Sequence, residues 1–153
     1  MRATTERLRT HPFLAGLDEE SLERIATIST VVALDAKTWL FREGDPADRC
    51  WLIRSGRVNL DVHLPGRGEV IVESLGAGAV LGWSWLFPPY RWHFDAVVVE
   101  PTSAIEVDGI QLRALCQTDP KLGYRLGQMF TAVLIERLQA TRLRLLDLYG
   151  PPR

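Results

Sequence analysis

Hydrophobic positions along the chain change their spacing twice, which divides it into three stretches. In the first, residues 1–29, Leu22, Ile25 and Ala26 recur three and four positions apart, which predicts a helix with one buried face. Asp18 stands just before this run and has the short acceptor side chain of a helix N-cap. We therefore expect two N-terminal helices, the second beginning after Asp18.

The second stretch, residues 30–107, is typical of β-structure. Short runs rich in β-branched and aromatic residues alternate with turn signals, Ser55-Gly56 among them, every eight to twelve residues. This spacing favours a sandwich, jelly roll or barrel. The run at 57–63 is the clearest, because Val58 and Leu60 alternate with polar neighbours. Period two predicts that Leu60 faces the core and that Asp61 faces solvent.

The third stretch, residues 108–149, is helical again. Asp108 can cap a short helix, and Asp119-Pro120 is an N-cap followed by proline at the first helical position. The second helix continues to about residue 149, where a Gly-Pro-Pro run ends it. Some 29 residues at a rise of ~1.5 Å give a helix about 43 Å long, which is longer than the domain needs to cover its own core.

Two apolar rows run along this long helix. The upstream row faces the β domain and consists of Leu122, Leu126, Met129, Phe130 and Val133. The downstream row repeats at steps of four and three, as in a coiled-coil seam, and consists of Leu134, Leu138, Thr141, Leu145 and Leu148. We predict that the downstream row forms a homodimer interface; the alternative is that both rows pack within one chain.

Composition bounds the class of protein. The chain has 153 residues, of which 46% are hydrophobic and 24% charged, with a net charge of −1; these values are typical of one soluble domain, residues 1–153. A basic nucleic-acid binder is disfavoured, no apolar run reaches the ~20 residues of a membrane span, and the N-terminus is too polar for a signal peptide. We expect a cytoplasmic protein without membrane contact.

Catalytic and metal-binding motifs do not stand out. The two cysteines, Cys50 and Cys116, lie far apart and form no CxxC pair, so we interpret them as reduced core thiols and expect no metal site. A nucleophile elbow, a P-loop and carboxylates placed for acid–base chemistry are all missing from the sequence. The sequence therefore predicts a protein that is not an enzyme.

Four segments together resemble the cyclic nucleotide-binding domain of the catabolite-activator type. They are HPFLAGLDEESLERIA at 11–26, LFREGDPADRCWLIRSGRVNL at 40–60, GAVLG at 78–82 and ERLQATRLR at 136–144. The resemblance implies a mainly β fold with flanking helices: an eight-strand, jelly-roll-like double-stranded β-helix plus a long C-terminal dimerisation helix. We expect a stand-alone sensor domain without the helix-turn-helix that follows in DNA-binding relatives, and therefore no direct DNA contact.

The ligand cassette is where the chain departs from this family. The resemblance implies a cyclic phosphate held by an arginine and by backbone N–H groups at a helix N-terminus, with a glutamate on the ribose hydroxyl. Gly82 is kept, but Trp83 stands at the glutamate position. Phe94 and Asp95 stand where arginine and serine or threonine precede Ala96. Tryptophan accepts no hydrogen bond, phenylalanine neutralises no phosphate, and aspartate repels one.

Two residues could still serve a nucleotide. Arg91 lies in a loop about two residues longer than the family pattern and could supply the missing cation. Thr141 aligns with a family residue that contacts the adenine. Without such compensation, an unpaired buried phosphate costs several kcal/mol, so we do not expect binding of ordinary cyclic AMP.

Aromatic residues replace the lost charges. Residues 83–94 contain six of them, including three of the five tryptophans. Three interpretations stay open: a pocket wall for a small planar or nucleotide-like ligand, a plug that fills the nucleotide cavity, and an exposed patch for a partner protein. The candidate ligand-binding residues are Gly82, Trp83, Ser84, Trp85, Arg91, Trp92, His93, Phe94, Asp95, Ala96 and Thr141.

The leading hypothesis is a non-enzymatic regulatory or sensor module with a degenerate cassette. It would signal through a helix dimer to a partner protein. One alternative is a structural interaction subunit whose pocket is plugged by aromatic side chains. A second alternative is a cyclic nucleotide binder that uses Arg91.

Overall fold

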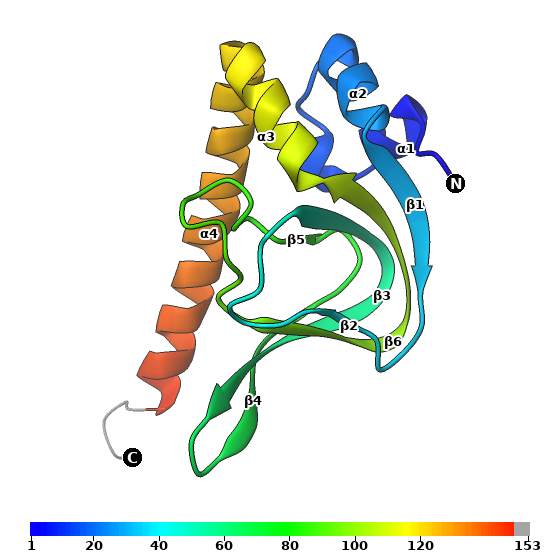
Figure 1. Ribbon diagram of the computed structural model, residues 1–153. Helices are drawn as coiled ribbons and strands as arrows, with labels where there is room; N and C mark the ends of the chain where they lie inside the picture. Colours follow the sequence, from blue (N-terminus) through cyan, green and yellow to red (C-terminus); the bar gives the residue numbers. More distant parts are fainter. Residues whose placement is uncertain (149–153) are drawn as a thin grey trace.

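The computed structural model describes residues 1–148, with the shorter helices at one end of a rolled β-sheet and the long C-terminal helix along its side (Figure 1). The helices are α1 (Thr5–Arg9), η1 (Pro12–Leu14), α2 (Glu19–Ala26), α3 (Gly109–Thr118) and α4 (Pro120–Leu148). The strands are β1 (Ser29–Leu34), β2 (Trp39–Phe41), β3 (Arg49–Leu64), β4 (Gly68–Leu75), β5 (Val80–Leu81) and β6 (Asp95–Asp108).

Capping residues confirm the predicted helix starts. The Asp18 side chain accepts a hydrogen bond from the Ser21 N–H, and the Asp108 carboxylate accepts one from the Gln111 N–H. Asp119 does the same for the Leu122 N–H at the start of α4. Each bond satisfies a backbone donor that has no partner within its helix.

Within residues 1–148, six antiparallel strands form the roll. The central path is β1-β6-β3-β4, while β2 pairs with β6 and β5 pairs with β3 on the same sheet. The expectation of eight separate strands is wrong, because two pairs of predicted runs are continuous. β3 passes through Ser55-Gly56 and β6 passes through Pro101, in each case with register shifts that bend the strand. A bulged long strand can turn through the corner of a roll without a break.

Gly56 shows why β3 continues through a predicted turn. Its φ is +99°, and a Cβ there would lie 2.6 Å from the Pro101 carbonyl oxygen and closer still to the Thr102 hydroxyl. Only glycine allows this close approach between β3 and β6 together with a left-handed backbone. The sequence signal for a turn was real, but it marks a bend within a paired strand.

The core has two parts. One lies between the helices and the near side of the sheet and contains Leu22, Ile25, Trp85 and Phe130. The other lies inside the roll and contains Trp51, Trp92 and the inward residues of β3 and β6. Along the first half of β3, Cys50 and Leu52 belong to the first part, whereas Trp51 and Ile53 belong to the second.

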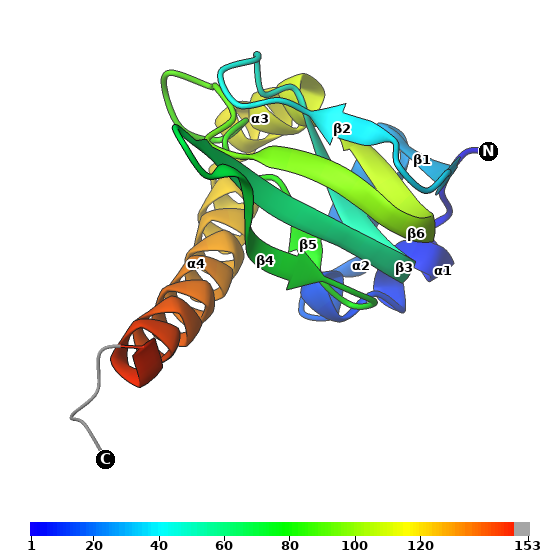
Figure 2. The ribbon, with the colours of Figure 1, turned by 90° about the horizontal axis from the view of Figure 1, so that it is seen from below.

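α4 packs along the roll by the upstream row predicted from the sequence. Leu122, Leu126 and Phe130 are fully buried, and Met129 and Val133 pack against the same cluster. Each fully buried side chain of this size contributes about 1.5–3 kcal/mol. One end of α4 extends past the strands (Figure 2).

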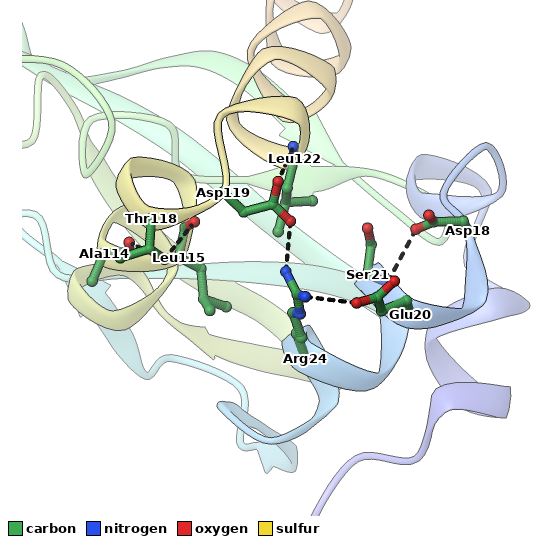
Figure 3. A network of polar contacts seen from close by, with 9 residues as sticks. All are labelled: Asp18, Glu20, Ser21, Arg24, Ala114, Leu115, Thr118, Asp119 and Leu122. Atoms are coloured by element: carbon green, nitrogen blue, oxygen red, sulfur yellow. Dashed lines mark hydrogen bonds and ion pairs between the residues drawn. The ribbon is translucent and has the colours of Figure 1, made fainter.

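A charged network ties the N-terminal helices to the start of α4 (Figure 3). Arg24 of α2 donates to the Asp119 carboxylate at 2.6 Å and to the Glu20 carboxylate at 2.6 Å. Asp119 is also the cap of α4, so one carboxylate both starts the helix and binds α2. Asp119, at the junction between α3 and α4, therefore contacts both α2 and the first turn of α4.

The predicted orientation of Asp61 is wrong. Its side chain is 8% exposed instead of facing solvent. The pairing of β3 with β4 shifts register between Leu60 and Asp61. The unpaired residue is Val72 of β4, and Asp61 keeps its register with Asp95 of β6. The burial of Asp61 therefore comes from its surroundings in the folded chain, which period two along β3 alone does not show.

Gly123 provides a test of the α3–α4 packing. A Cβ there would lie 2.8 Å from the Cys116 carbonyl oxygen, so we expect Gly123→Ala to lower the free energy of unfolding by about 1–3 kcal/mol. Gly127 is the matched control, because a Cβ added there would meet no atom of the chain within 4 Å. Gly127→Ala should raise stability by up to about 1 kcal/mol. Urea unfolding measures both; equal effects at the two positions would contradict the packing.

Candidate functional site

The cassette segment, residues 82–96, connects β5 to β6 and reaches into both parts of the core. Trp85 is fully buried and contacts the ring of Phe130 edge-on, with ring centroids 5.5 Å apart. Its indole Nε1–H donates to the Gly82 carbonyl oxygen at 3.1 Å. Trp85 therefore packs the cassette segment against α4 and does not line a ligand cavity.

An aromatic stack fills the interior of the roll. Trp92 lies parallel to Phe41, with ring centroids 3.8 Å apart and an angle of 11° between the planes. Trp51 lies beside both, at 5.8 Å from Phe41 and 6.1 Å from Trp92. We call Phe41, Trp51 and Trp92 the aromatic stack. All three side chains are buried, so the stack belongs to the core of the roll.

Little space is left beside the stack. The cavity lined by Trp83, Ser84, Trp92, His93 and Phe94 has a volume of about 10 Å³. This volume suffices for about one water molecule, whereas sites for small organic ligands are usually about 300–1,000 Å³. The predicted residues do come together here, but their side chains pack against one another.

Gly82 and Ala96 are small residues at positions where the chain packs closely around the aromatic stack. Gly82 has a φ of +97°, and a Cβ there would lie 3.0 Å from the Trp92 ring and 3.1 Å from the Arg49 carbonyl oxygen. Ala96 is fully buried in the same cluster as the stack. Gly82 is thus explained by the close approach of Trp92, without reference to a phosphate.

Arg137 of α4 reaches the cassette from outside the roll. Its guanidinium lies 5.0 Å from the centre of the Trp83 ring, and its Nε is 3.5 Å from a Glu73 carboxylate oxygen. Nη2 donates to the Val80 carbonyl oxygen, whereas Nη1 is buried and has no hydrogen-bond partner within residues 1–148. Burial lowers the pKa of this guanidinium, and the charge of Glu73 opposes that shift.

Arg91 points away from the cavity. Its side chain is exposed, and Nη1 donates to the Gly44 carbonyl oxygen at 3.0 Å, in the turn before β3. His93 is exposed as well. The neighbouring Arg113 of α3 donates to the Trp85 carbonyl oxygen at 2.7 Å and lies 3.9 Å from the centre of the Tyr90 ring. The arginines near the cassette thus bind backbone oxygens and aromatic faces.

Asp95 lies in an acidic environment. Its carboxylate accepts a hydrogen bond from the Glu43 N–H at 2.7 Å, and its strand partner on β3 is Asp61. Burial raises the pKa of the Asp61 carboxyl above its ordinary range, and the charges of Glu69 and Asp95 raise it further. The place expected for a phosphate-binding hydroxyl therefore carries two buried carboxyl groups.

The remaining predicted residues lie on α4. Thr141 is half-buried, and its hydroxyl donates to the Arg137 carbonyl oxygen at 2.9 Å. It is absent from the residues that line the cavity in the roll. Of the predicted seam, Leu138 is 67% exposed and Leu134 is half-buried, while the side chains of Leu145 and Leu148 lie outside the described residues.

The described residues offer few other chemical groups. Among residues 1–148, no three His, Cys, Asp or Glu side chains are placed to hold a metal ion. Burial raises the pKa of Cys50 to about 12 and that of Cys116 to about 11, so both thiols stay protonated and unreactive at neutral pH. No helix in this part of the chain has the length and apolar character of a membrane span.

Sequence reasoning missed the partners of the cassette. Phe41 and Trp51 come from other strands, and Arg113 and Glu73 come from α3 and β4. Phe41 and Trp51 lie within the segment at 40–60 that carries the family resemblance, but the contacts of all four residues with the cassette depend on the way the roll closes. Arg137 lies within a segment that carries the family resemblance, and that position was a usable signal.

Known proteins match this chain at both the sequence and the structural level. The family model described as the cyclic nucleotide-binding domain matches residues 31–119. A Geobacter metallireducens protein described as a cyclic nucleotide-binding protein is 30% identical, with a TM-score of 0.82 over 89% of this chain and 98% of that one. These matches agree with the β-roll and its flanking helices, which confirms the predicted fold class.

Two curated relatives come from Mycobacterium tuberculosis. A CRP-like cAMP-activated global transcriptional regulator is 28% identical over 109 residues, which are 71% of this chain and 47% of that protein. An uncharacterized NTE family protein is 37% identical over 73 residues, which are 48% of this chain and 12% of that protein. This chain thus spans about half of one relative and about an eighth of the other.

The buried acidic pair predicts a pH-dependent effect on stability. Asp61→Asn should raise the free energy of unfolding at pH 7 by about 0.2–1 kcal/mol, because it removes one of two like charges that face each other across strands. The folded-state pKa of Asp61 is raised, so its ionisation destabilises the fold as pH rises through that pKa. The gain should therefore shrink as pH falls towards the ordinary aspartate pKa. Chemical unfolding between about pH 3 and about pH 8 measures it, and Asp45→Asn, at an exposed position, should show no such trend.

Proposed function

We propose, for a chain that belongs to the cyclic nucleotide-binding domain family, that it is a non-enzymatic regulatory module whose β-roll is closed by its own side chains. In this proposal the module works without ordinary cyclic AMP. It acts through α4, as a homodimer that presents its surface to a partner protein. The aromatic residues of the cassette then serve as a plug, the second of the three interpretations of that segment.

One observation carries the proposal: the cavity inside the roll has a volume of only about 10 Å³. The space is occupied by the aromatic stack, in which Trp92 and Phe41 lie in van der Waals contact. A nucleotide could enter only if Trp92 left a fully packed site. Removal of a tryptophan-sized side chain from a core costs about 3–5 kcal/mol, which is comparable to the free energy of a millimolar binding equilibrium.

Electrostatics supports the same conclusion. The positions of the missing phosphate ligands carry Phe94 and Asp95, and Asp61 adds a second carboxyl beside Asp95. Arg91, the one residue expected to compensate, binds the Gly44 carbonyl oxygen on the surface. The residues that line the cavity in the roll include no arginine or lysine, so a cyclic phosphate there would lack the guanidinium partner that the family resemblance implies.

α4 is held on the roll by contacts that need no ligand. Arg125 donates to the Gly16 carbonyl oxygen, Arg137 to that of Val80 and Arg144 to that of Val72. The three arginines are spread along α4, and their acceptors lie in the turn before α2, in β5 and in β4, respectively. A ligand shifts a module of this kind only by binding two arrangements of α4 with different affinity. These contacts support a single arrangement of α4, and we infer a constitutive output.

The relative described as a cAMP-activated regulator gives a contrast. This chain shares 28% of residues with it over the matched segment, and the cassette residues Trp83, Phe94 and Asp95 do not suit a cyclic phosphate. We therefore propose that the family scaffold has been kept while ligand control was lost. Regulation would then act through the partner or through the amount of the protein.

Calorimetry tests the closed roll. We expect no binding heat with cyclic AMP, with any Kd weaker than about 1 mM, and no change in tryptophan emission across a panel of small metabolites. Arg91→Ala should behave like the wild type, because Arg91 lies outside the cavity. Micromolar binding that disappears in Arg91→Ala would contradict the proposal and establish the alternative nucleotide site.

Sedimentation tests the homodimer. Leu138 is exposed on α4, so Leu138→Glu should weaken a dimer at least about tenfold, since a charge in an apolar seam costs more than about 1.4 kcal/mol. Val99→Glu, at an exposed position on β6, is the control and should leave the dimer intact. A wild-type protein that sediments as a single chain at the highest attainable concentration would end the dimer proposal.

A further inference from the structure

Two surface loops of this chain pair along their backbones. The loop between β5 and β6 lies beside the loop between β2 and β3 (Figure 2). Three backbone hydrogen bonds join them; the N–H groups of Gly44, Trp92 and Ala47 donate to the carbonyl oxygens of Trp92, Asp45 and Tyr90, respectively, at 2.9, 3.0 and 2.7 Å. We call residues 43–47 the latch and residues 87–94 the strap. The latch and the strap thus form a short antiparallel ladder.

Side chains strengthen this pairing at two further points. The Arg91 side chain is exposed, and its Nη1 donates to the Gly44 carbonyl oxygen at 3.0 Å. Directly after the strap, the Asp95 carboxylate accepts a hydrogen bond from the Glu43 N–H at 2.7 Å. Arg91 therefore joins the strap to the latch from the solvent side, and this contact explains its position without a phosphate.

The strap carries the side chain that fills the roll. Among residues 87–93 only Trp92 is buried, and its ring stacks on Phe41 with ring centroids 3.8 Å apart. In the latch, residues 43–46 are exposed and Ala47 is buried. Segments with few buried side chains and exposed backbone hydrogen bonds open locally more easily than the core of a sheet. The paired loops have this character, whereas β3 and β6 form the centre of the sheet.

Tyr90 has an uncommon backbone conformation that its neighbours hold in place. Its φ is +58°, in the left-handed region that residues with a Cβ rarely adopt. Such a conformation persists where the surrounding structure determines it. Here the Tyr90 carbonyl oxygen accepts a hydrogen bond from the latch, and the Arg113 guanidinium lies 3.9 Å from the centre of the Tyr90 ring. Separation of the latch removes one of these supports and thereby favours release of the strap.

We propose that the strap and the latch form one conformational device. They open together, the ring of Trp92 leaves the aromatic stack, and the sheet stays folded. Arg91 holds this device closed, which replaces the phosphate-binding role expected from the sequence. The inference rests on the closed roll of the proposed function. It makes access to the interior depend on a surface turn instead of on a ligand inside the roll.

Hydrogen exchange followed by NMR tests the common opening. The backbone N–H groups of Gly44, Ala47 and Trp92 donate across the two loops, so we expect the same protection factor at all three. Their exchange should be faster than that of the Ile53 N–H, which donates to the Ala79 carbonyl oxygen in the roll. The indole N–H of Trp92 should exchange with the same protection, because its ring leaves the stack in the same event.

Arg91→Ala tests the role of the side chain. It should raise exchange at the three loop N–H groups about threefold, as expected for the loss of one hydrogen bond, and should leave the Ile53 N–H unchanged. Arg67→Ala, at an exposed position in the turn between β3 and β4, is the matched control and should change neither. Calorimetry of Arg91→Ala with cyclic AMP should still show no heat, because opening adds no phosphate partner to the roll.

A reversible cross-link tests the same motion in a single protein. Pro46 and Arg91 are antiparallel bridge partners, and their neighbours carry the hydrogen bonds of the ladder. The Cα atoms of such a pair lie about 4.5 Å apart, within the range of a disulfide. We expect Pro46→Cys/Arg91→Cys to form this bond on mild oxidation. The oxidised form should exchange at Ala47 and Trp92 at least about tenfold more slowly than the reduced form, which should resemble Arg91→Ala.

The results distinguish this inference from the proposed function. A common opening that Arg91→Ala accelerates and the disulfide suppresses supports the inference. Loop N–H groups that exchange no faster than the Ile53 N–H, no change in Arg91→Ala, or cysteines that fail to pair would each overturn it and leave the closed roll in place. Micromolar binding of cyclic AMP to the wild type overturns the closed roll itself, whatever the exchange rates.

Discussion

The packing of the roll depends on the contact between Trp92 and Phe41, whose ring centroids are 3.8 Å apart. It joins the cassette segment to β2 and fills the roll from within. A β-roll must either bind something in its interior or pack that interior with side chains, because an empty apolar cavity loses dispersion contacts on every wall. This chain packs it. Gly82 and Ala96 are small at the positions where the stack needs room.

Filling the roll has consequences for α4. In a roll that opens and closes around a ligand, the covering helix needs two arrangements of similar free energy. Here Leu122, Leu126 and Phe130 are buried against the core, and arginines bind backbone carbonyl oxygens at several places along the helix. Guanidinium groups suit this role because each offers several donors in a fixed plane. The helix is therefore part of the folded core along the first half of its length.

Much of the fold could be predicted from local sequence, and the reasons are physical. Helix caps such as Asp18 and Asp108 act within three residues, so their signals are local. The family resemblance supplied the topology, which spacing alone does not determine. The bend at Ser55-Gly56 looked like a turn because glycine marks both turns and bulges. The site was harder to predict, since the fate of Trp85, Trp92 and Phe87 depends on residues far away in the chain.

Arg144 illustrates a further consequence of these arginine contacts. β4 ends the central path of the sheet, and edge strands with free carbonyl and N–H groups can pair with strands of other molecules and begin aggregation. The Arg144 guanidinium occupies the Val72 carbonyl oxygen of β4 at 2.8 Å. A foreign strand that approached this margin would have to displace a charged side chain first. One backbone acceptor of β4 is thus already bonded to the long helix within the chain.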